Sequence, residues 1–454
     1  MAHQKKLPNR FPHVPSLAGE SCQKREKKSN SDNSHDRGFY PNELTSLGEG
    51  LKICYLFSML DFSRYHDAVR YMEGLSNIAS GPDYMKSRPH DPSIYIKRMQ
   101  WFLDLIGNPE RGFKYIHITG TAGKGTVASM IHRSLIMDHK KAGLFTSPFV
   151  TTSIEKIQVG DLYIAPDEFA DIVKAMKPKI DQAFAKCPWG GPSYFERFLA
   201  IALIYFKKLQ CQWVVLEVGC GGRYDATNVI PAPIISAITN IDYDHTHILG
   251  KTLTKIARDK AGIIKKGSKF FTTETRPRLR QIMEDICKEQ SASYAYVKGG
   301  NKELVEAMGF KTADVQLPAR FEIVQQKPLV IIDGAHNKAK IRHTAEQLKK
   351  LKFNKLHLVF ALAANKDRSI TNQIPADFIY PTRFSNPERQ CMNLGGYTDA
   401  HQALDAALKK AGPDDAILIT GSFYLAGELR QRWYAEESIL NARLSTVYPF
   451  LFHR

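Results

Sequence analysis

A glycine-rich segment of the chain has the residue types that hold phosphate. Residues 115–126 read YIHITGTAGKGT, and the residues before the first glycine are mostly the β-branched and aromatic types of a short strand. Residues 127–137 then carry apolar side chains at helical spacing. Glycines at a strand-to-helix turn let backbone amides approach an anion, and the start of the helix adds positive potential. The segment therefore predicts a phosphate-binding loop.

The side chains of this loop suit nucleotide phosphates. Lys124 supplies a mobile positive charge for the outer phosphates, and Thr126 supplies a hydroxyl that suits a metal ion. Gly120, Gly123 and Gly125 keep side chains away from the anion. The pattern G-x-x-x-x-G-K-[ST] is incomplete, because Gly125 separates Lys124 from Thr126. A tight strand-helix connection that binds nothing is the alternative interpretation.

A carboxylate follows at the end of a second apolar run. Residues 213–218 read WVVLEV and lead into the glycine-rich segment 219–228, so Glu217 stands where a strand gives way to a loop. Mg²⁺ prefers oxygen ligands, and a carboxylate at the carboxyl end of a strand is well placed to supply one. The alternative is an acidic side chain in a solvated loop.

A third apolar run ends in a cluster of acidic residues and histidines. Asp242, Asp244, His245 and His247 lie close together in sequence and could bind a metal ion or position a phosphate. Considered alone, such a loop is more often structural than metal-binding. Lys260 follows at the end of a predicted helix, between charged and apolar residues, where the local sequence by itself indicates a surface lysine.

An α/β framework must position these side chains. Helical periodicity covers residues 42–109, most clearly at 65–75 and 93–106, and predicts helices that cover a sheet. After the phosphate loop, strands and helices alternate, which predicts a mostly parallel sheet with ligands at the carboxyl ends of its strands. Further strands are predicted at 142–145, 213–218, 234–238 and 270–273, and helices at 166–176, 195–208, 254–261 and 278–288.

The pattern restarts near residue 318, which predicts a second and smaller α/β unit. Its strands are predicted at 320–324, 329–333, 355–360 and 416–420, and its helices at 339–351 and 399–411. Asp333 ends one of these strands, within the sequence IIDGAHN, and could accept hydrogen bonds from a ribose. We therefore expect a central domain with the phosphate loop and a parallel sheet at 41–315, and a Rossmann-like α/β C-terminal domain at 316–454.

The composition limits the compartment and the partners of the protein. The chain has 454 residues, 43% of them hydrophobic, but no uncharged apolar window of membrane-spanning length, which predicts no membrane segment. Seven cysteines are scattered without a C-x-x-C pair, which favours reduced thiols and a cytoplasmic location. The net charge of +17 favours anionic partners, among them nucleotides, polycarboxylates and nucleic acid. Residues 1–40 are predicted to be a disordered basic tail, with a nucleic-acid-binding arm as the alternative.

Together these segments resemble the folylpolyglutamate synthase and dihydrofolate synthase family, a branch of the Mur-type ATP-dependent amide ligases. The motifs occur in the order found in that family, from about residue 42 to about residue 430. They are GTAGKGT at 120–126, TSPF at 146–149, SYFE at 193–196, LEVGCGGRYDATN at 216–228, DHT at 244–246, LG at 249–250, DKAGI at 259–263, PARFE at 318–322, DGAHN at 333–337 and ITGSF at 419–423. The resemblance implies a Mur-ligase-like central domain followed by a glutamate-ligase domain.

The resemblance also implies a reaction. ATP would phosphorylate the carboxylate of folate or dihydropteroate, and the amine of L-glutamate would then displace phosphate to form an amide. The implied cofactors are ATP and Mg²⁺, with a monovalent cation such as K⁺ as a further candidate. Lys260 matches a lysine that is carbamylated in the family, which would turn it from a cation into an anion able to help hold a metal. The protein would act as a monomer and would need neither a membrane nor nucleic acid.

The resemblance assigns roles to the residues at matching positions. Lys124, His245 and Lys260 are implied to be catalytic. The ATP-binding residues would be Gly120, Ala122, Gly123, Lys124, Gly125, Thr126, Arg320, Asp333, His336 and Asn337. The metal ligands would be Ser147, Glu217, His245 and Lys260. Tyr194, Phe195 and Asp225 would face the pterin, although an aromatic pair at a helix start is as often part of the core.

Three positions depart from the family pattern. Ala122 stands where the family usually has asparagine beside the phosphates, Cys220 replaces an aliphatic residue, and Ala319 replaces a glycine. Two other functions stay open: Mur-type ligation of another carboxylic acid, such as a cell-wall precursor, and nucleic-acid binding through the basic tail without catalysis. The motifs do not separate the synthesis of dihydrofolate from the extension of existing glutamate chains.

Overall fold

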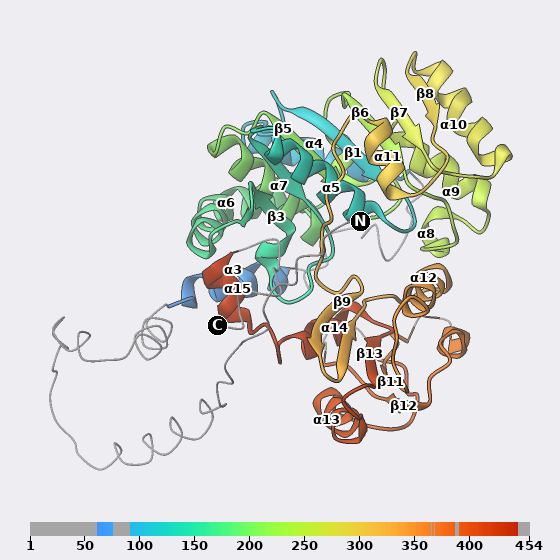
Figure 1. Ribbon diagram of the computed structural model, residues 1–454. Coiled ribbons are helices and arrows are strands. Elements are labelled where there is room, and N and C mark those ends of the chain that lie inside the picture. Colours follow the sequence, from blue (N-terminus) through green and yellow to red (C-terminus); the bar gives the residue numbers. More distant parts are fainter. Residues whose placement is uncertain (1–60, 76–90, 365, 367, 386–389, 444–454) are drawn as a thin grey trace, which may run out of the picture. The chain divides into compact units, whose positions relative to one another are not determined.

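The computed structural model describes residues 61–75, 91–364, 366, 368–385 and 390–443 (Figure 1). The predicted tail at 1–40 and the remainder of the predicted helical stretch, at 42–60 and 76–90, lie outside the described residues. The two clearest helices of that stretch are present as α3 (Ser63–Gly74) and α4 (Ile94–Leu105). Within the described ranges, no helix is long and apolar enough to cross a membrane.

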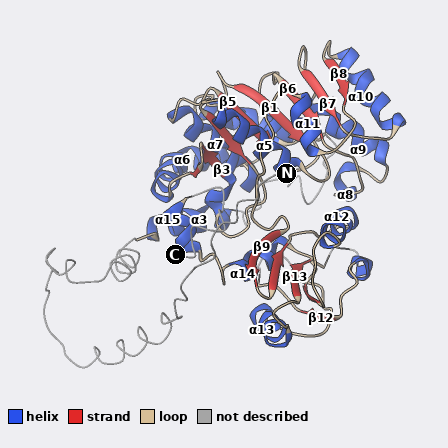
Figure 2. Cartoon of the chain, in the orientation of Figure 1, coloured by secondary structure: helices blue, strands red, loops and turns tan. Residues whose placement is uncertain are grey.

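The strand of the phosphate loop lies inside an eight-stranded sheet, the first sheet, in the order β4-β3-β2-β5-β1-β6-β7-β8 (Figure 2). The run β2-β5-β1-β6-β7-β8 is parallel, whereas β3 and β4 are antiparallel additions at one edge. The strands are β1 (Lys114–Thr119), β2 (Ala142–Phe145), β3 (Ile157–Val159), β4 (Leu162–Tyr163), β5 (Trp213–Glu217), β6 (Ile235–Ile238), β7 (Lys269–Thr272) and β8 (Ser293–Tyr296). The sequence did not predict β3, β4 and β8, because such short strands carry little periodicity.

Helices cover both faces of the first sheet, as predicted. Tyr115 of β1 lies in a buried cluster with residues of α4, α6 and α7, whereas its neighbour Ile116 lies in a cluster with α5 and α11. Successive strand residues point to opposite faces, which explains this division. The helices are α5 (Lys124–Met137), α6 (Pro166–Lys186), α7 (Tyr194–Lys208), α8 (Thr246–Leu249), α9 (Leu253–Lys260), α10 (Pro277–Glu289) and α11 (Asn301–Ala307).

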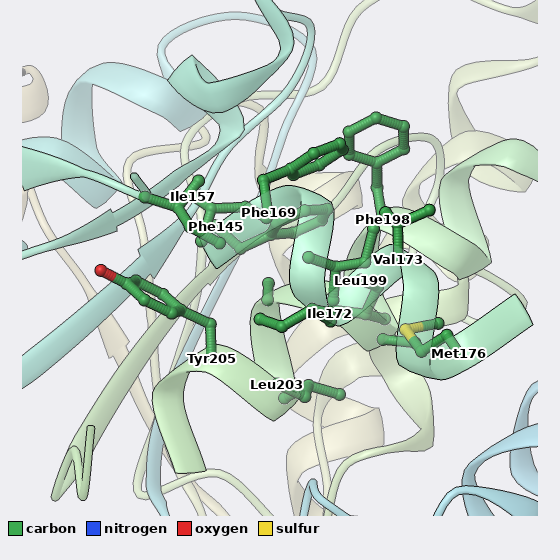
Figure 3. Close-up of a cluster of buried hydrophobic side chains, with 14 of the residues drawn as sticks. Phe145, Ile157, Phe169, Ile172, Val173, Met176, Phe198, Leu199, Leu203 and Tyr205 are labelled. Carbon is green, nitrogen blue, oxygen red and sulfur yellow. The ribbon is translucent and has the colours of Figure 1, made fainter. Parts of the chain in front are cut away.

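Helices α6 and α7 bury their apolar stripes against β2 and β3. Phe169 of α6, Phe198 and Leu203 of α7, and Phe145 of β2 gather in one cluster, and all four side chains are fully buried (Figure 3). Each large apolar side chain removed from water in this way contributes about 1.5–3 kcal/mol. The cluster therefore fixes α7, whose first residues were predicted to face the pterin.

Helix α6 is longer than predicted. The sequence predicts a helix at 166–176, but the helix continues through Pro178 to Lys186. Ile180 and Ala183 are buried in the same cluster as Phe169. Their burial prolongs the apolar stripe and outweighs the cost of one internal proline, which removes a backbone hydrogen bond.

Five more strands form the second sheet, in the order β12-β11-β13-β10-β9, with β9 antiparallel and the others parallel. The strands are β9 (Glu322–Gln326), β10 (Leu329–Ile332), β11 (Leu356–Phe360), β12 (Phe378–Pro381) and β13 (Ala416–Thr420). The helices are α12 (Lys338–Leu348), α13 (Ala400–Lys410), α14 (Phe423–Arg430) and α15 (Glu436–Ala442), and short 3-10 helices lie at Ser153–Lys156, Ala226–Val229, Ala261–Ile263 and Arg368–Gln373. The predicted α/β class with a second, smaller sheet is confirmed, while the domain limits stay a prediction.

A buried arginine joins the second sheet to the segment that follows β2. Arg430 of α14 donates to both carboxylate oxygens of Glu322, with Nε–Oε2 and Nη2–Oε1 distances of 2.9 and 3.0 Å. Its Nη1 donates to the Thr151 hydroxyl at 3.0 Å and lies 3.9 Å from Glu155 Oε1. Arg430 and Glu322 are each only 1% exposed. The paired geometry satisfies charges that would be costly to bury alone.

Replacing this arginine is expected to destabilise the fold. Arg430→Ala leaves the buried Glu322 and Glu155 carboxylates without their cation, so the free energy of unfolding should fall by about 3–5 kcal/mol. Urea unfolding followed by circular dichroism measures the change. The matched control is Arg432→Ala, which removes an exposed ion pair with Asp405 and should cost no more than about 1 kcal/mol. Equal losses in the two variants would contradict the assigned role of Arg430.

Candidate active site

The predicted phosphate loop joins β1 to α5. Gly120 and Gly123 have φ angles of 148° and 81°, and α5 begins at Lys124, so Gly125 and Thr126 lie in its first turn. A Cβ atom on Gly120 would lie 1.9 Å from Thr239 Oγ1. A side chain at this position would therefore displace the loop, and the strand-loop-helix arrangement needs glycine there.

The segment after β6 holds the phosphate loop in place. The backbone N–H of Thr121 donates to the Asn240 carbonyl at 2.9 Å, and that of Ala122 donates to Asn240 Oδ1 at 2.9 Å. The Thr239 hydroxyl donates to the Ala122 carbonyl at 2.6 Å. Both backbone groups of Ala122 are thus engaged, so this departure from the family pattern leaves the loop anchored through its backbone.

Two lysines converge on one carbonyl of the loop. Lys124 Nζ and Lys260 Nζ donate to the Gly120 carbonyl at 3.1 and 3.0 Å. Lys260 is only 4% exposed, so the interpretation of the local sequence as a surface lysine is wrong. Burial, followed by repulsion from Lys124, lowers the pKa of Lys260 to about 8. A cation at this carbonyl prepares the loop for an anion and brings Lys260 into the site.

Glu217 lies at the carboxyl end of β5, against the start of α5. Its Oε2 accepts a hydrogen bond from the Ser147 backbone N–H at 3.1 Å. A Cβ atom on Gly125 would lie 3.1 Å from the same oxygen, so glycine allows the carboxylate to approach the helix. Burial raises the pKa of the Glu217 carboxyl, and the charges of Lys124 and Arg320 oppose this rise. The structure thus brings together two of the four predicted metal ligands, Ser147 and Glu217.

His245 and Asp244 occupy the turn before α8. His245 has a φ angle of 48°, and burial lowers its pKa to about 4 against the attraction of Asp244, so its imidazole is neutral near pH 7. Asp242 Oδ1 instead accepts the Tyr243 backbone N–H. Across the described ranges, no three His, Cys, Asp or Glu side chains form a group able to hold a metal ion. Asp242, Asp244, His245 and His247 therefore do not make a metal site by themselves.

Asp333 and Arg320 lie where the second sheet meets the site. Asp333 accepts the backbone N–H groups of Phe321 and Ala335, at 3.0 and 2.7 Å, and burial raises its pKa. The Arg320 guanidinium lies 4.1 Å from the centre of the Phe423 ring. A pocket is lined by residues on and around the first sheet, among them Gly125, Ser147 and Glu217, and by Pro318 and Arg320 from the segment before β9.

His336 and Asn337 connect the second sheet to Asp244. His336 Nδ1 lies 2.8 Å from the Gly334 carbonyl, and Asn337 Nδ2 donates to Asp244 Oδ2 at 3.1 Å. Burial raises the pKa of Asp244, but the charge of His245 and the lysines nearby outweigh it and hold the pKa below its usual range. Of the four predicted ATP-binding residues of the second unit, Arg320 lines the pocket and Asn337, next to His336, contacts Asp244, whereas Asp333 binds the backbone of Phe321 and Ala335.

The predicted pterin residues divide into two groups. Phe195 and Asp225 both lie against Gly219, where an added Cβ would be 2.8 Å from Phe195 Cζ and 3.2 Å from Asp225 Oδ2. Tyr194 turns away from them, and its hydroxyl accepts a hydrogen bond from Lys156 Nζ at 2.9 Å. The structure therefore brings Phe195 and Asp225 together and places Tyr194 beside a buried lysine.

Several site residues escaped the sequence analysis. Asn301 lies beside the phosphate loop, because a Cβ on Gly123 would be 2.9 Å from its Oδ1. Lys340 Nζ lies 3.2 Å from His336 Nε2, and Lys366 Nζ lies 3.9 Å from Asp244 Oδ1. No local pattern marks these residues, since each reaches the site from a distant part of the chain. Phe423 falls in the ITGSF motif, and its aromatic type was the available signal.

The class of protein follows from the second sheet and the phosphate loop together. Residues 319–423, which contain β9 to β13, match the family described as Mur ligase, glutamate ligase domain. A phosphate loop on a mostly parallel sheet precedes this domain. The chain thus combines a phosphate loop with a domain of the Mur ligase, glutamate ligase type.

Known proteins narrow this class. The dihydrofolate synthase/folylpolyglutamate synthase of Bacillus subtilis (strain 168) is 27% identical over 442 residues, which cover 82% of this chain and 99% of that protein. A folylpolyglutamate synthase from Thermotoga maritima has a TM-score of 0.67 and 26% identity, over 82% of this chain and 97% of that one. A folylpolyglutamate synthase in complex with AMPPCP has a TM-score of 0.66 and 26% identity, over 81% and 99%. The chain is a homologue of the folylpolyglutamate synthases and dihydrofolate synthases, so the resemblance predicted from the motifs is confirmed.

The phosphate loop gives a direct test of the site. Lys124→Ala removes the mobile cation, so the dissociation constant for AMPPCP should rise at least about tenfold, and turnover should be lost. Isothermal titration calorimetry measures the binding, and thermal unfolding should show an unchanged fold because Lys124 is half-buried and bonded to a single carbonyl. The control is the exposed Lys140→Ala. Near-normal affinity in Lys124→Ala would remove this lysine from nucleotide binding.

Proposed function

We propose that this protein joins L-glutamate to a folate or dihydropteroate carboxylate at the expense of ATP, through an acyl phosphate. The observation that carries the proposal is the convergence of Lys124 and Lys260 on the Gly120 carbonyl, beside the Glu217 carboxylate and the Arg320 guanidinium. Such a cluster suits a reaction in which negative charge moves between phosphate and carboxylate oxygens. The names of the relatives, dihydrofolate synthase and folylpolyglutamate synthase, support the folate class of acceptor.

The first step is phosphorylation of the acceptor. A carboxylate oxygen of the folate attacks the γ-phosphorus of ATP, the bond from this phosphorus to the β,γ-bridging oxygen breaks, and ADP leaves. The backbone amides at the start of α5 and the Lys124 ammonium bind the phosphate oxygens, and Arg320 approaches from the second sheet. Their charges are in place before reaction, so little reorganisation is needed as charge develops.

The second step forms the amide. The neutral amine of L-glutamate attacks the acyl carbon, a C–N bond forms, and the C–O bond to phosphate breaks. Inorganic phosphate leaves, and the amine nitrogen loses one proton. These groups would meet at the pocket lined by Ser147, Glu217 and Arg320, and exclusion of water there on substrate binding would protect an acyl phosphate from hydrolysis.

Mg²⁺ fits the residues that surround the phosphate loop. The Glu217 carboxylate, the Ser147 hydroxyl and the neutral His245 imidazole would supply protein ligands, and nucleotide phosphate oxygens would supply others. Mg²⁺ usually keeps few protein ligands and completes its shell with phosphates and water, which agrees with the sparse donor set. The ion would neutralise phosphate charge during transfer. We also propose a monovalent cation such as K⁺ as a second ion.

Residues around the same site would contact ATP and the folate. Arg320, Asp333, His336 and Asn337 of the second unit would complete the ATP site that begins at residues 120–126. The AMPPCP complex of a similar protein supports nucleotide binding there. Tyr194, Phe195 and Asp225 would face the pterin, with Phe195 and Asp225 adjacent at Gly219. The excess of positive charge would suit a product that lengthens as a chain of glutamates.

We propose that Lys260 is carbamylated in the working enzyme. Its neutral amine attacks the carbon of CO₂, a C–N bond forms, and one proton leaves to solvent. Burial lowers the pKa of Lys260 to about 8, so a much larger share of this amine is neutral near pH 7 than for an ordinary lysine. The resulting carbamate would carry negative charge next to Lys124 and could serve a metal ion.

The oligomeric state, the location, the partners and the domain limits of the protein are also proposals. We propose a monomeric cytoplasmic enzyme whose substrates are small molecules and which needs no nucleic acid. Its central domain would comprise residues 41–315 and its glutamate-ligase domain residues 316–454.

The function predicts folate-dependent release of ADP. Purified protein is mixed with ATP, Mg²⁺ and L-glutamate, and ADP is measured with dihydropteroate or tetrahydrofolate as the acceptor. Activity with dihydropteroate would define a dihydrofolate synthase, and activity with tetrahydrofolate alone would define a polyglutamylating enzyme. If neither acceptor increases the release of ADP, the folate assignment is refuted. A panel of other carboxylic acids would then identify the acceptor.

Carbamylation of Lys260 predicts a dependence on CO₂ and on pH. The neutral amine increases as the pH rises toward about 8, so activity at limiting CO₂ should rise over that range and fall at lower pH. Removal of dissolved CO₂ should lower activity, and bicarbonate should restore it. ¹³C NMR with labelled bicarbonate should show a carbamate signal that Lys260→Met lacks and that the exposed Lys266→Ala keeps. An identical spectrum for Lys260→Met would exclude carbamylation at this residue.

A further inference from the structure

Lys340 is a cation of the site that the mechanism above does not use. It is the third residue of α12, and its Nζ lies 3.2 Å from His336 Nε2. His336 Nδ1 faces the Gly334 carbonyl at 2.8 Å, and a carbonyl can only accept, so Nδ1 carries the proton. Nε2 is then free to accept from Lys340. The neutral imidazole thus holds the ammonium in one position without cancelling its charge.

Among the described residues, Lys340 lacks a carboxylate partner of its own. Within the ranges that the structure describes, no ion pair joins its Nζ to an acidic side chain within 4 Å. Asp244 carries the nearest negative charge to act on it, but this carboxylate already accepts from Asn337 Nδ2 and from the His245 backbone N–H, at 3.1 and 3.0 Å. The Lys340 ammonium is half-buried and its hydrogen-bond partner is a neutral ring, so its charge is not compensated and favours the binding of an anion.

Other cations surround Lys340. Burial lowers the pKa of Lys340 to about 7 against the attraction of Asp244. Repulsion from Lys124, Arg320 and Lys366 adds to this lowering, so the four positive groups share one electrostatic environment. They come from the phosphate loop, from the segments before β9 and after β11, and from α12. A bound anion would remove the repulsion among them and restore full charge to Lys340.

We propose that Lys340 binds the terminal phosphoryl oxygens of the nucleotide, opposite Lys124 of the phosphate loop. Lys124 reaches the outer phosphates from the first sheet, and Lys340 reaches the same charge from the second. A carboxylate of the incoming amino acid has related chemistry, but the influence of Lys124 and Arg320 on Lys340 favours the phosphoryl group. His336 is a positioning residue in this arrangement, since it acts through Lys340.

This inference rests on the proposed function only for nucleotide binding. A contact to the terminal phosphoryl group should distinguish nucleotides that possess it from those that lack it. Lys340→Gln should therefore weaken AMPPCP binding about tenfold or more and change ADP binding less than twofold. Lys340→Arg keeps the charge and should recover most of the affinity for AMPPCP.

Isothermal titration calorimetry of the full chain with Mg²⁺ and either AMPPCP or ADP makes the comparison. The matched control is Lys349→Ala, an exposed lysine directly after α12, which should leave both affinities unchanged. Equal losses for AMPPCP and ADP, or no loss for either, would overturn the proposal. So would an unchanged AMPPCP affinity combined with a raised KM for glutamate, which would assign Lys340 to the amino-acid carboxylate.

The comparison also separates this inference from the ligase assignment. AMPPCP binding needs neither an acceptor nor glutamate, so a wild-type protein that binds AMPPCP but releases no ADP with folates refutes the ligase alone. Wild-type protein that fails to bind AMPPCP overturns the contact as well. Thermal unfolding of each variant checks its fold. If Lys340→Gln fails to fold, Lys340→Met takes its place. The proposal is then overturned if Lys340→Arg prefers AMPPCP over ADP no more strongly than Lys340→Met does.

Discussion

Positive charge held out of water around the phosphate loop is the interaction on which the rest of this structure depends. Lys124 and Lys260 both donate to the Gly120 carbonyl, while Lys340 donates to the neutral ring of His336. Cations in such surroundings are costly because burial strips water from them, and their hydrogen-bond partners here, a carbonyl and a neutral ring, carry no negative charge. The lowered pKa values of Lys260 and Lys340, caused first by burial, record that cost. Anionic ligands relieve it, so part of the affinity for a nucleotide is stored in the folded protein.

Two buried ion pairs hold the elements around these charges in place. Arg98 is paired with Glu196 at 2.9 Å where α7 begins, and Arg430 is paired with Glu322 where α14 ends. These pairs are neutral overall and lie in the two regions that carry the aromatic residues at 194–195 and the Arg320 segment. Arg98 and Arg430 are thus neutralised by carboxylates, whereas Lys260 and Lys340 donate to a carbonyl and to a neutral ring. The hydrogen-bond partner separates the charges that support the fold from the charges that are suited to bind an anion.

Local chemistry explains which parts of the site could be predicted from the sequence. The phosphate loop, Glu217 and Asp333 each stand at the end of a strand, and a strand end followed by glycine is visible in the sequence. The contact of Glu217 with Ser147 and the buried state of Lys260 depend on pairing between distant strands, so only the family resemblance pointed to them. Lys340 had no signal at all, because its role depends on the ring of His336 one helical turn away. The continuation of α6 through Pro178 could not be predicted for a similar reason, since it depends on the burial of the residues that follow this proline.

A chain of hydrogen bonds connects Asp225 to strand β1, which leads into the phosphate loop. Asp225 accepts the Thr227 hydroxyl, so His117 Nε2, which lies 2.8 Å from that oxygen, must donate its proton to it. Burial lowers the pKa of His117 to about 3, which keeps the ring neutral and this tautomer in place. His117 belongs to β1, and Gly120, whose carbonyl accepts from two lysines, directly follows the same strand. Because β1 is paired on both sides within the sheet, it fixes the spacing between the phosphate loop and the segment that carries Asp225.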